Sequence, residues 1–209
     1  MPTIAEPYEI SLSSNFDWAL REGSMHFENE SAVQKTLRQL AKRLDEIGVP
    51  YAVAGGMALF FHGYRRFTED VDVLVNRDGL KRIHEKLEGL GYTPPFSGSK
   101  NLRDTQSGVR IEFLITGDYP GDGKPKPVSF PEPAAAAIEI SGIKFVALPT
   151  VIEMKLASGM SNPRRAKDLV DVQELIAQLG LDESLADDLN PYVRDRYLEL
   201  VRIVRDNPE

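Results

Sequence analysis

Residues 51–75, YAVAGGMALFFHGYRRFTEDVDVLV, contain two features that cost stability in the elements they occupy. Gly55-Gly56 follows a short apolar run, and two aspartates alternate with valines in a stretch that otherwise has the composition of a buried strand. Glycine loses more conformational freedom on folding than any other residue, and aspartate is depleted in strands. Together the two features raise the question of which ligand they hold.

The two aspartates lie on one face of the expected strand, because alternation places Asp70 and Asp72 together and the three valines opposite. Carboxylates roughly 7 Å apart repel by about 0.6 kcal/mol in water and about 2.4 kcal/mol at an effective dielectric constant near 20. A divalent cation between them turns this repulsion into attraction, and hard cations such as Mg²⁺ prefer carboxylate oxygens. Taken alone, the D-V-D pattern equally fits a solvated edge strand with two surface aspartates.

The glycine pair favours a ligand-binding site over a solvated edge strand. A strand that ends in Gly55-Gly56 and continues as a helix presents bare backbone N–H groups at a helix N-terminus, where phosphates bind. A lone Gly-Gly pair is more typical of a tight turn without a ligand. The order of an apolar strand, Gly-Gly, a short helix and a D-V-D strand predicts a phosphate-binding backbone beside a metal-binding carboxylate pair.

The segment AGGMALFFHGYRRFTEDVDVLV resembles the signature of the nucleotidyltransferase superfamily, whose catalytic core is shared with DNA polymerase beta. Within that superfamily it is most similar to the small bacterial nucleotidyltransferases grouped with abortive-infection toxins. The resemblance is strong over 51–75 and partial to about residue 171. It implies a metal-dependent enzyme that moves a nucleoside monophosphate from a nucleoside triphosphate to an acceptor hydroxyl and releases pyrophosphate, with Mg²⁺ or Mn²⁺ as cofactor.

The family also needs a third carboxylate on a strand beside the D-V-D strand. The alternating segment VRIEFLI over 109–115 offers Glu112 for this place. Many relatives carry aspartate there, so the longer side chain departs from the common pattern. Two alternatives stay open: Glu112 is a solvated residue paired with Arg110, or Glu139 in the segment AIEI takes the third place. We expect Asp70, Asp72 and Glu112 to be the catalytic and metal-binding residues.

Residues near the C-terminal end of the resemblance also correspond to the toxin-like group. Lys155-Leu156-Ala157 matches its Lys-Leu-Ala stretch, and Arg165, Asp168 and Asp171 match residues of the next helix. The resemblance implies nucleotide binding by Gly55, Gly56, Lys155, Arg165 and Asp168. Otherwise, Lys155 is a surface lysine, and the two aspartates form ion pairs with Arg164 and Lys167 along one helix.

The residue patterns predict a core of strands and helices to about residue 148, followed by a C-terminal helical cap. The resemblance implies that this core is an α+β fold, a small mixed sheet flanked by helices. Apolar spacing indicates a helix over 31–47, and Asn76 or Asp78 is placed to cap a helix after the D-V-D strand. A hairpin is expected around 141–142, and Thr150 with Glu153 has the pattern of a capping box. The predicted domains are an irregular N-terminal arm (1–30), the catalytic core (31–148) and the helical region (149–209).

One long loop is expected at residues 117–133, GDYPGDGKPKPVSFPEP, which is rich in proline and glycine. Its Gly-Lys pair is superficially similar to a phosphate-binding loop. The required spacing is absent, because Pro125 follows the lysine where serine or threonine is needed. This loop therefore has no function assigned from the sequence.

Composition limits the choice of partners. The formal charge is −7 with a pI near 5.1, which argues against broad binding of a phosphate backbone. Cysteine is absent, no apolar run approaches the ~20 residues of a membrane span, and the N-terminus lacks signal-peptide features, so we expect a cytoplasmic protein without membrane contact. The acceptor stays open among a tRNA, a protein and a small molecule, and an antitoxin is a candidate partner. A non-catalytic nucleotide- or partner-binding module is the alternative function.

Overall fold

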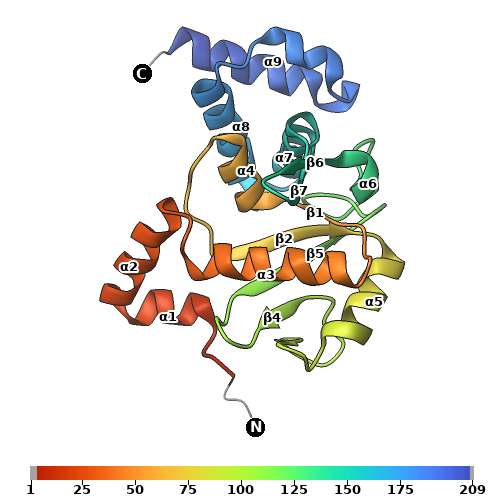
Figure 1. The fold of residues 1–209 in the computed structure, drawn as a ribbon. Coiled ribbons are helices and arrows are strands. Elements are labelled where there is room, and N and C mark those ends of the chain that lie inside the picture. Colours follow the sequence, from red (N-terminus) through yellow and green to blue (C-terminus); the bar gives the residue numbers. More distant parts are fainter. Residues whose placement is uncertain (1–3, 208–209) are drawn as a thin grey trace.

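The computed structural model describes residues 4–207, which form a mixed sheet with helices around it (Figure 1). Its order is β3-β4-β5-β2-β1-β7-β6. The strands are β1 (Ala52–Val53), β2 (Asp70–Val75), β3 (Tyr92–Thr93), β4 (Leu102–Asp104), β5 (Arg110–Ile115), β6 (Ala137–Ile140) and β7 (Ile143–Val146). Parallel pairs (β2 with β5, β1 with β7) and antiparallel pairs occur in the same sheet, as predicted.

Helices precede, interrupt and follow the strands, which confirms the predicted α+β class with C-terminal helices. They are α1 (Tyr8–Ser14), α2 (Phe16–Phe27), α3 (Ala32–Glu46), α4 (Gly55–His62), α5 (Arg77–Leu87), α6 (Pro133–Ala136), α7 (Leu148–Ser161), α8 (Ala166–Leu179) and α9 (Pro191–Asp206), with 3₁₀ turns η1 (Pro163–Arg165) and η2 (Glu183–Asp188). Figure 1 shows α3 lying along the sheet, with α8 and α9 at the end of the molecule away from the N-terminus. Of the helices in residues 4–207, none is both long and apolar enough to span a membrane.

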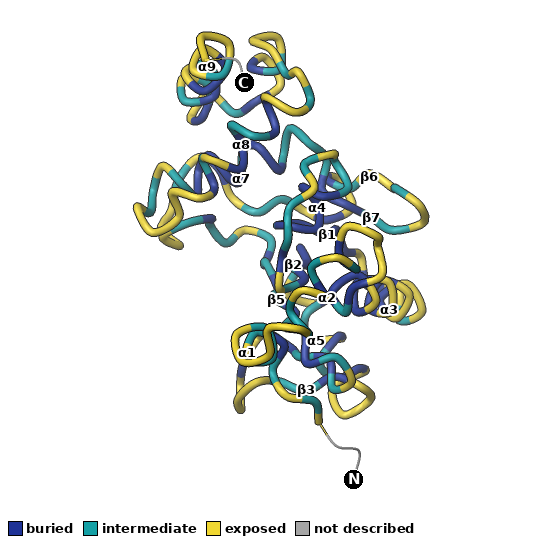
Figure 2. The backbone as a smooth tube through the Cα atoms, turned by 90° about the vertical axis from the view of Figure 1, so that its left-hand side faces the viewer, coloured by how far each residue is buried: buried dark blue, intermediate teal, exposed yellow. Residues whose placement is uncertain are grey.

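The centre of the sheet is the parallel pair β2 and β5, which matches two predicted strands. Six residue pairs hold its register, and this register sets Asp72 opposite Glu112. One face of the pair is fully buried, where valines of β2 lie beside Ile111, Phe113 and Ile115 of β5. Figure 2 shows this buried centre continuing through β1 and α4, with exposed backbone on the outer turns of α1 and α3. The opposite face carries the carboxylates.

Local signals fixed several element boundaries as expected. The predicted helix over 31–47 is α3, and its apolar spacing buries Leu37, Leu40 and Leu44. Asn76, rather than Asp78, caps α5, because its side-chain oxygen accepts the N–H of Gly79 at 2.8 Å. The predicted hairpin is β6–β7.

The N-terminal arm is not irregular: residues 8–27 form α1 and α2, while residues 1–3 of the predicted arm lie outside the described part. Polar groups hold these helices in place. The Tyr8 hydroxyl donates to the Glu22 carboxylate at 3.0 Å, and Glu22 also accepts the N–H of Ala32 at 2.9 Å. His26 is fully buried and its Nε2 lies 3.0 Å from the carbonyl oxygen of Arg66. Because the inward residues are polar, hydrophobic periodicity does not reveal the helices.

The capping box predicted at Thr150 and Glu153 is also wrong. Helix α7 begins two residues earlier, at Leu148, and only Ala147 separates it from the end of β7 at Val146. Thr150 therefore lies inside the first turn. The Glu153 carboxylate accepts the backbone N–H of Asn190, which precedes α9, and so joins two helices instead of capping one.

Candidate active site

Three carboxylates meet on the less buried face of the central strand pair. Asp70 and Asp72 project from β2 and Glu112 from β5, and one oxygen of each lies within 4.8 Å of the others. The register explains the meeting, since Asp72 stands directly opposite Glu112. Glu139 lies instead on the edge strand β6, opposite Lys144 of β7. The structure thus brings Glu112, and not Glu139, to the aspartate pair.

The three carboxylates carry more negative charge than their neighbours neutralise. Burial, reinforced by the charges of Asp70 and Glu112, raises the pKa of Asp72 to about 7. Arg110 offsets part of the charge: its Nη2 lies 3.2 Å from Asp70 and its Nε 3.0 Å from Glu112. The expected Arg110–Glu112 pair therefore exists, within a carboxylate cluster. Closely set carboxylate oxygens with excess negative charge fit a hard divalent cation.

Gly55 packs directly against this cluster. Its φ is +57°, a left-handed conformation, and a Cβ built on it would lie 1.7 Å from Oδ2 of Asp72. A Cβ on Gly56 would lie 2.5 Å from the Thr68 hydroxyl oxygen, and that hydroxyl donates to Asp70 at 2.9 Å. A methyl group at either position would therefore clash with side chains of the cluster even in the absence of a ligand.

Gly55→Ala is expected to displace the Asp72 carboxylate and to weaken Mg²⁺ and Mn²⁺ binding, although it changes no charge. The left-handed backbone adds a conformational cost of about 1–2 kcal/mol. Calorimetric titration with Mn²⁺ measures the binding, and the melting temperature measures the fold. Gly23→Ala is the matched control, since a Cβ there meets nothing within 4 Å and the residue is helical. Equal Mn²⁺ affinity in both variants would contradict the expectation.

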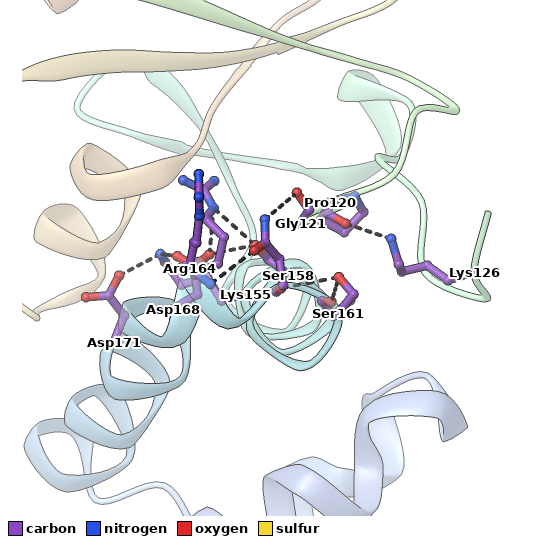
Figure 3. Close-up of polar contacts among 12 residues, drawn as sticks. Pro120, Gly121, Lys126, Lys155, Ser158, Ser161, Arg164, Asp168 and Asp171 are labelled. Carbon is purple, nitrogen blue, oxygen red and sulfur yellow. Dashed lines mark hydrogen bonds and ion pairs between the residues drawn. The ribbon is translucent and has the colours of Figure 1, made fainter. Parts of the chain in front are cut away.

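A second polar cluster lies between α7 and α8 (Figure 3). Lys155 is buried, with its Nζ 2.9 Å from Oδ1 of Asp168 and 2.6 Å from Oδ2 of Asp171. Ser158 donates to Asp168 at 2.6 Å, and Arg66 from the α4–β2 loop lies 2.9 Å from Asp171. Lys155 is therefore not a surface lysine.

The aspartates of this cluster do not form the i,i+4 pairs with Arg164 and Lys167 that the helical spacing allowed. Burial acts to raise the pKa of Asp168, but Lys155, Ser158 and Arg165 outweigh it and hold the pKa below its ordinary value. Arg165 lies 3.3 Å from Asp168 at i,i+3 spacing. The main partners come from other elements, and sequence reasoning did not assign Arg66 to the site.

Lys155→Met is expected to destabilise the fold by about 3–5 kcal/mol, because it leaves two buried carboxylates without their shared cation. Urea unfolding followed by circular dichroism measures this change. Lys144→Met is the control: Lys144 pairs with Asp45 at the surface, where such a pair contributes up to about 1 kcal/mol. A loss no larger in Lys155→Met than in Lys144→Met would contradict the structural role of the buried lysine.

The two clusters face one cavity of about 710 Å³. Every site residue expected from the sequence lines it: Gly55, Gly56, Asp70, Asp72, Glu112, Lys155, Arg165 and Asp168. Exposed cations stand at its rim, where Arg164, Arg165 and Lys167 surround the start of α8. The structure brings the predicted residues together, and their chemical roles stay predictions.

Comparison with models of known protein families assigns the chain to a family. The family model described as "Nucleotidyl transferase AbiEii toxin, Type IV TA system" matches residues 38–208. The chain belongs to the AbiEii family. It is therefore a nucleotidyltransferase, and the resemblance to abortive-infection toxins is confirmed. Helices α1 and α2 precede the part matched by the AbiEii model.

Solved structures share the fold at low sequence identity. ANT(2'')-Ia, in complex with adenylyl-2''-tobramycin, has a TM-score of 0.51 and 15% identity over 79% of this chain and 97% of its own. An antigenic nucleotidyltransferase-like protein from Paracoccidioides brasiliensis has the same TM-score and identity over 83% of this chain and 88% of its own. No curated protein sequence matches the chain. These neighbours support the nucleotidyltransferase fold of this AbiEii-family protein.

Proposed function

We propose that this protein catalyses Mg²⁺- or Mn²⁺-dependent transfer of a nucleoside monophosphate from a nucleoside triphosphate to an acceptor hydroxyl, with release of pyrophosphate. The observation that carries the proposal is the cluster of Asp70, Asp72 and Glu112, whose oxygens lie within 4.8 Å of one another beside the glycine-led start of α4. Such a set of oxygens is suited to divalent cations that neutralise phosphate charge.

Each group has a proposed role in this reaction. Asp70 and Asp72 would hold the metal, and Glu112 would complete a second metal position. Bound divalent cations would supply charge neutralisation on the phosphates and lower the pKa of the acceptor hydroxyl. The backbone N–H groups of Gly55 and Gly56 would bind the β- and γ-phosphates at the helix N-terminus. Glu112 would hold the acceptor hydroxyl and take its proton.

The wall of the cavity formed by α7, η1 and the start of α8 would contribute to nucleotide binding through Arg165, Lys155 and Asp168. The Arg165 side chain is 60% exposed at the rim and is placed to reach a phosphate. Lys155 is engaged by two aspartates, so its proposed contribution is to fix this wall and add positive charge near the phosphates. Asp168, which pairs with both of these side chains, would orient Lys155 and Arg165.

The test is incubation of the purified protein with Mg²⁺, each of the four α-labelled nucleoside triphosphates and a fractionated cell lysate. We expect pyrophosphate release and label in one fraction, which identifies the acceptor as RNA, protein or small molecule. The Asp72→Asn protein, incubated in the same way, is the control, and label that appears with it as well comes from enzymes of the lysate. Nucleotide binding without pyrophosphate release in any fraction would instead support the non-catalytic binding module.

We also propose that the protein acts as a toxin whose activity a cognate antitoxin protein counters. The support is the family description, which places AbiEii proteins in type IV toxin–antitoxin systems. Induced expression should arrest bacterial growth, and expression of the Asp72→Asn variant to the same level should not. Equal arrest by both variants would separate toxicity from nucleotidyl transfer.

A further inference from the structure

The cavity has two chemically different ends. The carboxylates, the glycines and the rim cations make one end charged. The other end is apolar and is lined by Leu114, Tyr119, Pro120, Phe130, Val151 and Met154. Leu114 lies two residues after Glu112 on the same face of β5, so the apolar end begins roughly 7 Å from the carboxylates.

Half of these residues, Tyr119, Pro120 and Phe130, belong to the proline- and glycine-rich loop over 117–133, to which the sequence analysis assigned no function. Hydrogen bonds tie its two ends together: Gly117 N–H donates to Phe130 at 2.9 Å, and Phe130 N–H donates to Asp118 at 2.8 Å. Gly121 packs on α7, where a Cβ would lie 2.2 Å from the Ser161 hydroxyl oxygen. The loop is thereby fixed at both its base and its middle.

Lys126 holds the turn that carries Tyr119. Its Nζ donates to the carbonyl oxygen of Pro120 at 2.7 Å and pairs with Asp122 at 2.7 Å, as Figure 3 shows for the contact with Pro120. The lysine side chain is only 6% exposed, and its Nζ lies 5.7 Å from the centre of the Tyr119 ring. A charged group is seldom buried unless it is paired, so this lysine indicates a fixed loop conformation. A fixed wall loses little conformational entropy when a ligand binds.

We propose that Tyr119 and Phe130 form the wall that binds the nucleobase of the incoming nucleoside triphosphate. The inference rests on the proposed function and assigns a contact within the same cavity. A nucleoside triphosphate has a charged end and a flat aromatic end, as the cavity does. Tyr119 is half-buried and lines the cavity, and stacking on aromatic side chains accepts every base. Triphosphate position and base position are therefore set by separate walls.

The test compares two ligands that share the charged end. In the presence of Mg²⁺, calorimetry measures binding of a nucleoside triphosphate and of inorganic tripolyphosphate, which has no base. Tyr119→Ala is expected to weaken nucleoside triphosphate binding on the order of tenfold and to leave tripolyphosphate binding unchanged. Tyr119→Phe keeps the ring and should bind both ligands as the unchanged protein does. Phe96→Ala is the matched control, since Phe96 is 68% exposed and is not among the residues lining the cavity.

Lys126→Met provides a second, independent variant. Without its hydrogen bond to Pro120, the turn loses its anchor, so nucleoside triphosphate binding should weaken several-fold while tripolyphosphate binding persists. The melting temperature of each variant shows whether the fold is retained. This variant tests the positioning of Tyr119 without removing the ring.

Three results would overturn the inference. Equal weakening of both ligands in Tyr119→Ala would make the residue a general support of the cavity. Unchanged nucleoside triphosphate binding with slower transfer to the acceptor would assign the apolar end to the acceptor instead. Failure of the unchanged protein to bind any nucleoside triphosphate with Mg²⁺ would overturn the proposed function and this inference together, whereas normal binding by Tyr119→Ala overturns only the latter.

Discussion

Asp72→Asn is expected to abolish metal-dependent nucleotidyl transfer and, in the absence of metal, to raise the melting temperature. Asp72 lies among the oxygens proposed to hold the metal, so its loss removes a ligand and a charge. In the metal-free protein the same carboxylate is buried beside Asp70 and Glu112, and both effects disfavour its charged form. Asparagine keeps the shape and relieves the repulsion. Each kcal/mol gained should raise the melting temperature by about 2–4 °C in a protein of this size.

The gain in stability should depend on pH in a defined direction. The folded-state pKa of Asp72 is raised from 3.8 to about 7, so the unchanged protein keeps the full contribution of this group below pH 3.8 and loses it as pH rises towards 7. Melting curves recorded with a chelator should therefore give Asp72→Asn a higher melting temperature than the unchanged protein at pH 8. This difference should shrink towards pH 4. Asp78→Asn, at an exposed position in the first turn of α5, is the control and should change stability by no more than about 0.5 kcal/mol. A stability loss at pH 8 would show that Asp72 makes favourable contacts in the fold.

Glu112→Gln is expected to lower the transfer rate on the order of 10²–10⁴-fold while triphosphate binding survives. Glutamine keeps the shape but cannot take a proton from the acceptor hydroxyl, and loss of a positioned acid–base group typically has this effect. In the proposed function, binding of the triphosphate would rest mainly on Asp70, Asp72 and the glycines, so Glu112→Gln should retain it. Single-turnover kinetics separate the chemical step from binding, and calorimetry measures the latter.

Glu139→Gln is the matched control for this measurement. Glu139 is exposed on the edge strand β6, opposite Lys144, and three strand steps of the sheet order separate β6 from β2. Its substitution should leave both rate and affinity unchanged. Loss of transfer in Glu139→Gln together with normal transfer in Glu112→Gln would show that the third carboxylate has been assigned to the wrong strand.

The carboxylate cluster was predictable because local patterns determine it. Alternation of apolar residues sets which face of β2 and β5 is buried, and this leaves Asp70, Asp72 and Glu112 on the other face. The choice between Glu112 and Glu139 required the sheet order, which alternation alone does not give. The strand order became available only with the structure.

The contacts that support the cluster were not predictable in the same way. Arg66 and Asp171 are 105 residues apart, and nothing local in either segment indicates their ion pair. Helix α2 turns Glu22 and His26 inward, so its buried side is polar and hydrophobic periodicity fails. Contacts between distant polar groups depend on the packing of whole elements, which a single sequence does not reveal.

The register of β2 against β5 also limits how this enzyme can lose its activity over generations. A slip of one residue would turn Glu112 away from the aspartates, but it would equally expose Ile111, Phe113 and Ile115. Chains with an insertion or a deletion within either strand would therefore misfold. Such variants are not expected to persist as folded, inactive proteins. Substitution of a single carboxylate has no such penalty. Inactive descendants that still fold are accordingly expected to carry substitutions at positions 70, 72 or 112 with both strands unchanged in length.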